Sequence, residues 1–397
     1  MYSRQRSGFS ANSELNGTGH PHRFVADADG FPLSPRRSRD YPFPTMTKSR
    51  KKEPSVPRAD VSASARKTNP PDGHAREVTV GCLFAAIGGF ARAFQQSGAN
   101  VLWANEKDKF AAETFRANFP TVRHIHKPVE QLTVGGDKLP PVDIITAGFP
   151  CQPFSAAGEK KGFEDMARGL VFLEIIRLLG EFGKTKPKIL LLENVQYFRN
   201  HDGGRTFKRV QAEVQKAGYW FADKHAVVLN TTEHTDIPQN RDRLFMVAYS
   251  CDHFAGNAFA FPRPYTGARR PVPSFLDLDR QQDERYYFKP GSRYYPHFAA
   301  AMATGKPDSV YQLRRNYVRE NRSGECFTLM ANMGEGGHNV PVVRDRWGIR
   351  KLTPRECARL QGYDDDFVFP PGLSHAQPGN SARVEMTARS VSRGAMP

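Results

Sequence analysis

Hydrophobic and polar positions alternate in blocks after a polar N-terminal stretch, and the blocks predict strands and helices in turn. Short β-rich runs lie at 78–84, 101–104 and 142–147. The first leads into Ala-Ala-Ile-Gly-Gly, the second into Asn-Glu and the third into a glycine. Between them, 90–96 and 108–118 have the pattern of helices. Strands that alternate with helices in this way are typical of an α/β fold with a doubly wound, mostly parallel sheet.

The pattern continues towards the middle of the chain. The predicted helix 170–182 places on one stripe the residues Phe172, Ile175, Ile176 and Leu179. The run 188–192 is continuously apolar, as expected of a strand that is covered on both faces. A further β-rich run follows at 244–249, and a helix is predicted at 353–361.

This fold places a ligand site at one edge of the sheet. In doubly wound sheets, ligands lie beyond the carboxyl ends of the strands. The polar or special residues at those ends are Gly88, Gly89, Glu106, Cys151 and Glu193. We therefore expect the chemistry of this protein to involve them.

Two segments do not follow the pattern. Residues 1–75 contain 13 Lys and Arg against 7 Asp and Glu and few aliphatic side chains, so this tail carries +6 of the net charge of +16. Such a composition predicts disorder, because the segment buries too little apolar surface. The stretch 251–343 is rich in Pro, Arg, Tyr and Gly, and we assign it no regular elements.

Net charge and cysteine usage constrain the type of partner and the redox compartment. A charge of +16 favours a polyanionic partner, although basic tails produce the same signal. The 5 cysteines are scattered and form no C-x-x-C pair, which disfavours a disulfide framework or a zinc site and favours a reducing, intracellular setting. No apolar run approaches the ~18 residues of a membrane helix, and no secretory signal is expected.

The turn at 81–89 is the first candidate site. Glycines between a first strand and a helix let the backbone approach a nucleotide-like ligand. About twenty residues further on, Glu106 ends the second strand, where its carboxylate can accept hydrogen bonds from ribose hydroxyls. The turn is not a G-x-G-x-x-G motif, so nucleoside binding and a purely structural role both remain open.

Cys151 and Glu193 are candidate reactive groups. Cys151 lies between Pro150 and Pro153 on a stiff backbone and is a candidate nucleophile; the alternative is a buried structural cysteine. Glu193 follows the most apolar predicted strand, where partial desolvation favours the protonated form and general acid chemistry. The alternative for Glu193 is a helix N-cap interaction.

Arg241 and Arg243 precede the β-rich run 244–249. We expect these alternate side chains to point to opposite faces, one towards a site and the other towards the fold. An ordinary edge strand would explain the pattern as well.

In order and spacing, these segments resemble the motifs of the cytosine-C5 DNA methyltransferases. The matching segments are 150–155, 193–195, 239–243, 352–362 and 379–381. The resemblance covers about 77–390 and implies a Rossmann-like, S-adenosylmethionine-dependent methyltransferase fold. It divides the chain into a catalytic and cofactor-binding domain at 76–250, a smaller irregular target-recognition region at 251–343 and a return to the catalytic domain at 344–397.

The resemblance also implies roles for individual residues. Cys151 attacks C6 of a flipped cytosine, which makes C5 reactive, and protonated Glu193 stabilises the negative charge that develops towards N3. Arg243 holds O2 of the base, and Arg241 braces the site. The implied cofactor is S-adenosylmethionine, without a metal. Its pocket would use Phe84, Gly88, Gly89, Glu106, Asp143, Val171 and Asn380.

Two positions depart from the family pattern. The first glycine of its F-x-G-x-G-G turn is Ala86 here, and its adenine-contacting aspartate falls near Pro128. These departures keep open the alternative of a DNA-binding homologue with impaired catalysis. A second alternative is methylation of tRNA cytosine, which a branch of the family performs with the same motifs.

The expected partner is double-stranded DNA with a specific target sequence. We expect a monomeric enzyme of a microbial restriction–modification system, with a restriction endonuclease acting separately and no membrane association. The expected location is the bacterial cytoplasm, in association with the nucleoid.

Overall fold

The computed structural model describes residues 77–150, 171–255, 259–314, 317–330, 333 and 340–370. The helices are α1 (Gly89–Gln96), α2 (Lys109–Asn118), α4 (Val171–Phe182), α5 (Arg205–Lys216), α6 (Thr231–His234), α7 (Tyr295–Ala303) and α8 (Pro354–Arg359). The first eight strands are β1 (Thr79–Leu83), β2 (Asn100–Asn105), β3 (Arg123–Ile125), β4 (Ile144–Ala147), β5 (Ile189–Val195), β6 (Tyr219–Trp220), β7 (Ala226–Asn230) and β8 (Asp242–Ser250). Four more are β9 (Val310–Arg314), β10 (Tyr317–Asn321), β11 (Val342–Arg344) and β12 (Ile349–Lys351).

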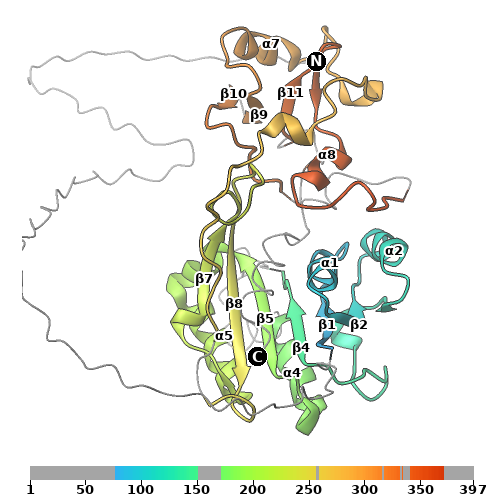
Figure 1. The fold of residues 1–397 in the computed structure, drawn as a ribbon, viewed down its shortest axis with the longest axis vertical. Helices are drawn as coiled ribbons and strands as arrows, with labels where there is room; N and C mark the ends of the chain where they lie inside the picture. Colours follow the sequence, from blue (N-terminus) through green and yellow to red (C-terminus); the bar gives the residue numbers. More distant parts are fainter. Residues whose placement is uncertain are drawn as a thin grey trace, which may run out of the picture. The chain divides into compact units, whose positions relative to one another are not determined.

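The larger sheet has eight strands in the order β3-β2-β1-β4-β5-β8-β6, and β7 also pairs with β8 (Figure 1). Strands β1 to β5 pair in parallel, as the alternation of strands and helices predicts. Strand β8 runs antiparallel to β5, β6 and β7. The sheet is therefore mixed at this end, a feature that hydrophobic pattern alone does not report.

Both faces of the sheet are buried. Along β8, Phe245 and Val247 join one core cluster, whereas Leu244 and Met246 join the other. The apolar run of β5 alternates in the same way. Helices α1 and α2 contribute to the first cluster, and α4 and α5 to the second. The prediction that 188–192 forms a strand covered on both faces is confirmed.

A second sheet lies largely in the segment to which the sequence assigned no elements. Its order is β10-β9-β11-β12, and all its pairs are antiparallel. The strands have three to five residues each, too short for a clear period-2 pattern. Because β12 ends at Lys351, this sheet extends past residue 343.

A buried ion-pair network connects β12 with α8. The Arg350 side chain is fully buried and contacts Asp345 (Nε–Oδ2 2.7 Å) and Glu356 (Nη2–Oε1 2.8 Å), whose side chains are also fully buried. Glu356 and Thr353 form a capping box at the start of α8. One guanidinium thus contacts two carboxylates, and each buried charge lies beside an opposite one, as burial requires.

Three further sequence predictions concern the cysteines, membrane-spanning helices and the N-terminal tail. Of the cysteines, Cys82, Cys251, Cys326 and Cys357 lie in the described ranges, and all four are free. Among the described residues, no helix combines the length and apolar character that crossing a membrane requires. The predicted disordered tail, 1–75, lies outside the described residues.

Candidate active site

The predicted site residues follow the ends of four parallel strands that are in register. Leu83, Asn105, Ala147 and Leu192 lie in register across β1, β2, β4 and β5. The residue after each of them is Phe84, Glu106, Gly148 or Glu193. The carboxyl ends of four parallel strands therefore present these residues along one edge of the sheet, as the sequence predicts.

The turn after β1 is tightly constrained. Phe84 and Ala86 both have positive φ (53° and 48°), and Gly88 caps α1 with φ of 100°. A Cβ on Gly88 would lie 2.2 Å from the Phe119 ring, so only glycine fits. Ala86 occupies a left-handed conformation that favours glycine. Gly89 is the first residue of α1.

Glu106 holds this turn in place. Its Oε2 accepts a hydrogen bond from the Ala86 N–H (2.8 Å), and its Oε1 accepts one from the Asp108 N–H (2.8 Å). A carboxylate oxygen has two acceptor positions, so both oxygens can accept a further bond. Glu106 can thus position the turn and bind a hydroxyl-bearing ligand together.

Of the remaining predicted cofactor residues, Phe84, Asp143 and Val171 lie in the described ranges. Val171 begins α4, and both it and Phe84 are partly buried against the second core cluster. Asn380 lies outside the described residues, as does Cys151. Pro128 precedes a short 3-10 helix, Val129–Gln131, and offers no side-chain acceptor.

The structure does not support a place for Asp143 in the cofactor pocket. Asp143 precedes β4 and lies at the amino end of the strands, opposite to Glu106. Its Oδ2 accepts from the N–H and hydroxyl of Thr79, and its Oδ1 contacts Lys188 Nζ at 2.9 Å. These contacts lower the pKa of Asp143 in spite of its partial burial. The carboxylate links the starts of neighbouring strands and lies away from the cofactor edge, so its role is structural.

Glu193 and Arg243 form an ion pair across β5 and β8. The Arg243 Nε lies 2.9 Å from the Glu193 Oε1, and the two side chains are 14% and 13% exposed. Burial lowers the pKa of Arg243, and the charges of Glu193 and Asp242 act against that effect. A Cβ on Gly148 would lie 3.3 Å from the Glu193 Oε2, so the second oxygen faces the segment that leads to Cys151. Glu193 lies within a strand, which excludes the N-cap alternative.

Arg241 lies in the same pocket as Arg243. It is 2% exposed, and its Nη1 donates to the carbonyl of Leu329 (2.7 Å). Both side chains line one pocket, so the expectation that they point to opposite faces is wrong. Residues two apart in an extended chain project to the same side.

Asn194 is a site residue to which the sequence analysis gave no role. It is buried, and its Nδ2 donates to the Phe149 carbonyl (3.0 Å). Its own Oδ1 accepts from the Val195 N–H (2.9 Å). Asn194 therefore fixes the backbone two residues before Cys151. The signal for Asn194 in the sequence was an amide side chain directly after the candidate acid, at the end of an apolar run.

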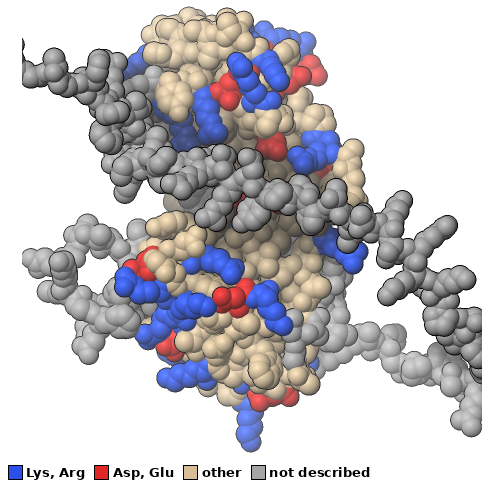
Figure 2. Space-filling model, turned by 90° about the vertical axis from the view of Figure 1, so that its left-hand side faces the viewer, with Lys and Arg blue, Asp and Glu red and all other residues tan. Residues whose placement is uncertain are grey.

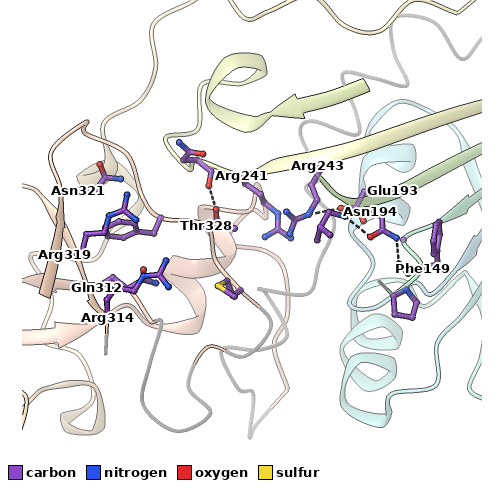
Figure 3. Close-up of a pocket in the computed structure, with 16 residues that line it drawn as sticks. Phe149, Glu193, Asn194, Arg241, Arg243, Gln312, Arg314, Arg319, Asn321 and Thr328 are labelled. Atoms are coloured by element: carbon purple, nitrogen blue, oxygen red, sulfur yellow. Dashed lines mark hydrogen bonds and ion pairs between the residues drawn. The ribbon is translucent and has the colours of Figure 1, made fainter. Parts of the chain in front are cut away.

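A pocket of about 690 Å³ contains this arrangement (Figure 3). One wall consists of Gly148, Phe149, Pro150, Glu193, Asn194 and Arg243, and the other includes Gln312, Arg314, Arg319 and Asn321. On the face drawn in Figure 2, basic side chains lie beside acidic ones at several places, so charge alone marks no binding surface there.

Three of the described cysteines are poor candidates for the nucleophile. Burial raises the pKa of the Cys82 thiol to about 12 and that of Cys357 well above its ordinary value. Cys326 is buried in the third core cluster. A thiol must ionise to attack, and burial in apolar surroundings opposes this.

Comparison with known proteins decides the family. The family model "C-5 cytosine-specific DNA methylase" matches residues 78–392. The chain belongs to this family. It is 39% identical over 316 residues to the Type II methyltransferase M.Bsp6I of Bacillus sp. (strain RFL6), covering 78% of this chain and 96% of that protein. It is 34% identical over 325 residues to the Type II methyltransferase M.HhaI of Haemophilus parahaemolyticus, covering 77% and 90%.

Solved structures agree on the fold of this methylase. The Dnmt2 methyltransferase of S. pombe superposes with a TM-score of 0.60 at 19% identity, covering 80% of this chain and 98% of that one. A putative DNA modification methyltransferase encoded in an E. coli prophage gives 0.56 at 22%, covering 80% and 98%. The predicted Rossmann-like methyltransferase fold is confirmed.

Proposed function

We propose that this protein transfers a methyl group from S-adenosylmethionine to C5 of cytosine in a specific duplex DNA sequence. The observation that carries the proposal is the Glu193–Arg243 pair, which faces the segment leading into Cys151. Membership of the C-5 cytosine-specific DNA methylases supports the same reaction. The tRNA alternative has less support, because the relatives with the higher identities are named Type II methyltransferases.

Glu193 and Arg243 on the pocket wall, together with Cys151 outside the described residues, fit the chemistry of cytosine. The Cys151 thiolate adds to C6, and electron density then moves to C5 and towards N3. In the complex with the base, Glu193 carries a proton on Oε2 and donates it to N3, while its Oε1 stays beside the Arg243 Nε. Another N–H of the Arg243 guanidinium donates to O2. Once C5 carries the methyl group, a water molecule takes the C5 proton, and the C5–H electrons re-form the C5–C6 double bond as the Cys151–C6 bond breaks. N3 returns its proton to Glu193, and the Cys151 thiolate is free again. General acid help of this kind contributes a factor of ~10²–10⁴ in rate.

The residues around the turn fit the cofactor. When bound, S-adenosylmethionine supplies the methyl group. Glu106 retains acceptor positions for hydroxyl groups, and the partly buried Phe84 ring can stack on an apolar or aromatic group. Gly88 keeps the turn close to Phe119. Val171 and Asn380 complete the proposed set, together with Gly89.

The proposed setting is a restriction–modification system, since the relatives at 39% and 34% identity are named Type II methyltransferases. The separate endonuclease, the monomeric state, the absence of a metal and the bacterial location remain predictions. The target base is inaccessible in a stacked duplex, so the enzyme must flip it out of the helix.

The Cys151→Ala variant tests the reaction. We expect it to abolish methyl transfer from labelled S-adenosylmethionine to duplex DNA and covalent trapping by 5-fluorocytosine DNA, while cofactor binding in a calorimeter persists. Full transfer by the variant would overturn the assignment. Parallel assays with tRNA test the RNA alternative, and no cofactor binding by the natural protein would favour the non-catalytic alternative.

A further inference from the structure

The β9–β10 hairpin presents one polar face to the candidate active site. Gln312 pairs directly with Arg319, and Arg314 with Tyr317. Side chains two residues apart share a face of a strand, so Arg314 follows Gln312 and Asn321 follows Arg319. All four polar residues line the pocket, as Figure 3 shows. The intervening Leu313 and Val318 pack into the core of the small sheet instead.

Arg319 and Arg314 differ in how they are held. The Arg319 guanidinium carbon lies 5.1 Å from the centre of the Phe327 ring. Within the described part of the chain, neither arginine contacts a carboxylate, and both are exposed. Arg314 has no aromatic platform among those residues. Arg319 therefore presents a guanidinium oriented by the Phe327 ring, whereas Arg314 presents an exposed charge that no described carboxylate or ring orients.

The platform under Arg319 is fixed relative to the catalytic residues. On one side of Phe327, the Cys326 N–H donates to the Pro238 carbonyl (2.6 Å). On the other side, the Thr328 hydroxyl donates to the Asn240 carbonyl (2.6 Å). The segment that receives these bonds continues directly into β8, which carries Arg243. The spacing between Arg319 and the cytosine pocket is thus set by hydrogen bonds.

We infer that Arg319 reads a guanine at a fixed offset from the methylated cytosine and that Arg314 contacts the DNA backbone. Guanine presents two acceptors, O6 and N7, in the major groove, and an oriented guanidinium can donate to both. An exposed arginine with no carboxylate partner among the described residues suits a phosphate, which carries charge but no sequence information. This inference rests on the proposed function and adds the residue and base that determine specificity.

A randomised substrate tests the assignment. The full chain is incubated with S-adenosylmethionine and duplexes in which one cytosine is flanked by random positions, and methylation is scored by bisulfite sequencing. For the natural protein we expect a guanine at one offset. For Arg319→Ala we expect the preference at that offset to fall by roughly 5- to 150-fold, with other positions unchanged. Arg319→Lys should relax the same position, because lysine lacks the planar pair of donors.

Arg314→Ala is the matched control on the same face. It should weaken binding of all sequences alike, without changing the preferred sequence. The slope of the logarithm of the binding constant against the logarithm of salt concentration should become shallower by about 1. Both arginines are exposed, so we expect the unfolding temperatures of the variants to match that of the natural protein.

The outcomes separate the two proposals. An unchanged preference in Arg319→Ala, or a loss that is equal for all sequences, would overturn guanine reading and leave the methyltransferase assignment intact. Guanine reading would also be overturned if the natural protein methylated a defined sequence that has no guanine at a fixed offset. If the natural protein methylates no duplex, the proposed function fails, and the assignment of Arg319 fails with it.

Discussion

The Arg243 Nε lies 2.9 Å from the Glu193 Oε1, although fifty positions separate the two residues in the chain. The antiparallel pairing of β5 and β8 brings them together: Val195 pairs with Arg243, and Glu193 is two residues earlier on the same strand. Both side chains are largely shielded from water. A buried charge that loses its partner is costly, so each residue holds the other in the pocket.

Glu193→Gln should reduce the rate of methyl transfer by a factor of ~10²–10⁴, because glutamine can accept a bond from Arg243 but cannot donate an acidic proton. Single-turnover kinetics on duplex DNA measures the change. Glu193→Ala is the control for folding and should lower the unfolding temperature more than Glu193→Gln. A glutamine variant with the natural rate would show that the carboxyl group has no acid role.

Asn194→Asp should slow covalent trapping of Cys151 by 5-fluorocytosine DNA by about 10- to 100-fold, because the lost donor leaves the Phe149 carbonyl unheld and the nucleophile misplaced. Asn118→Asp is the matched control. Asn118 also donates to backbone carbonyls, those of Thr114 and Val368, but lies outside the pocket. If both variants trap DNA at the natural rate, Asn194 does not position the nucleophile.

Gly88→Ala should destabilise the protein by about 2–5 kcal/mol, since the new Cβ meets the Phe119 ring and the backbone has positive φ. The Gly98→Ala variant separates the effect of positive φ from that of the contact with Phe119. Gly98 has φ of 80° but no atoms within 4 Å of the new Cβ, so this variant should lose only about 1–2 kcal/mol of stability. Urea unfolding measures both variants. Equal losses would contradict a role for the contact with Phe119.

Protonation of His124 should destabilise the protein in acid. Burial, with a smaller contribution from Arg116, lowers its pKa from 6.5 to about 4. The folded state stays neutral while the unfolded state binds a proton, so the stability that is present above pH 6.5 is lost as pH falls towards 4. Both ring nitrogens lack partners among the described residues, which makes His124→Leu a suitable variant. Urea unfolding between pH 7 and pH 4.5 should show a smaller decrease for the variant, and parallel curves would contradict the prediction.

The sequence by itself determined the alternation of strands and helices, because hydrophobic periodicity reports local structure and burial. It also placed Glu106 and Glu193 at the ligand-binding edge, since parallel strands share their carboxyl ends. The resemblance to the methyltransferase motifs added the roles that periodicity cannot supply.

Only the tertiary structure decided which distant residues are partners. It showed Asp143 at the opposite end of β4, bonded to Thr79, and Asn194 bonded to Phe149. It also showed that β9 and β10 contribute Gln312, Arg314, Arg319 and Asn321 to the pocket that contains Arg243. The physical reason is that these contacts depend on strand register and direction, which involve pairs of residues far apart in the chain. A periodic pattern records which side of a strand is buried and not which strand lies beside it.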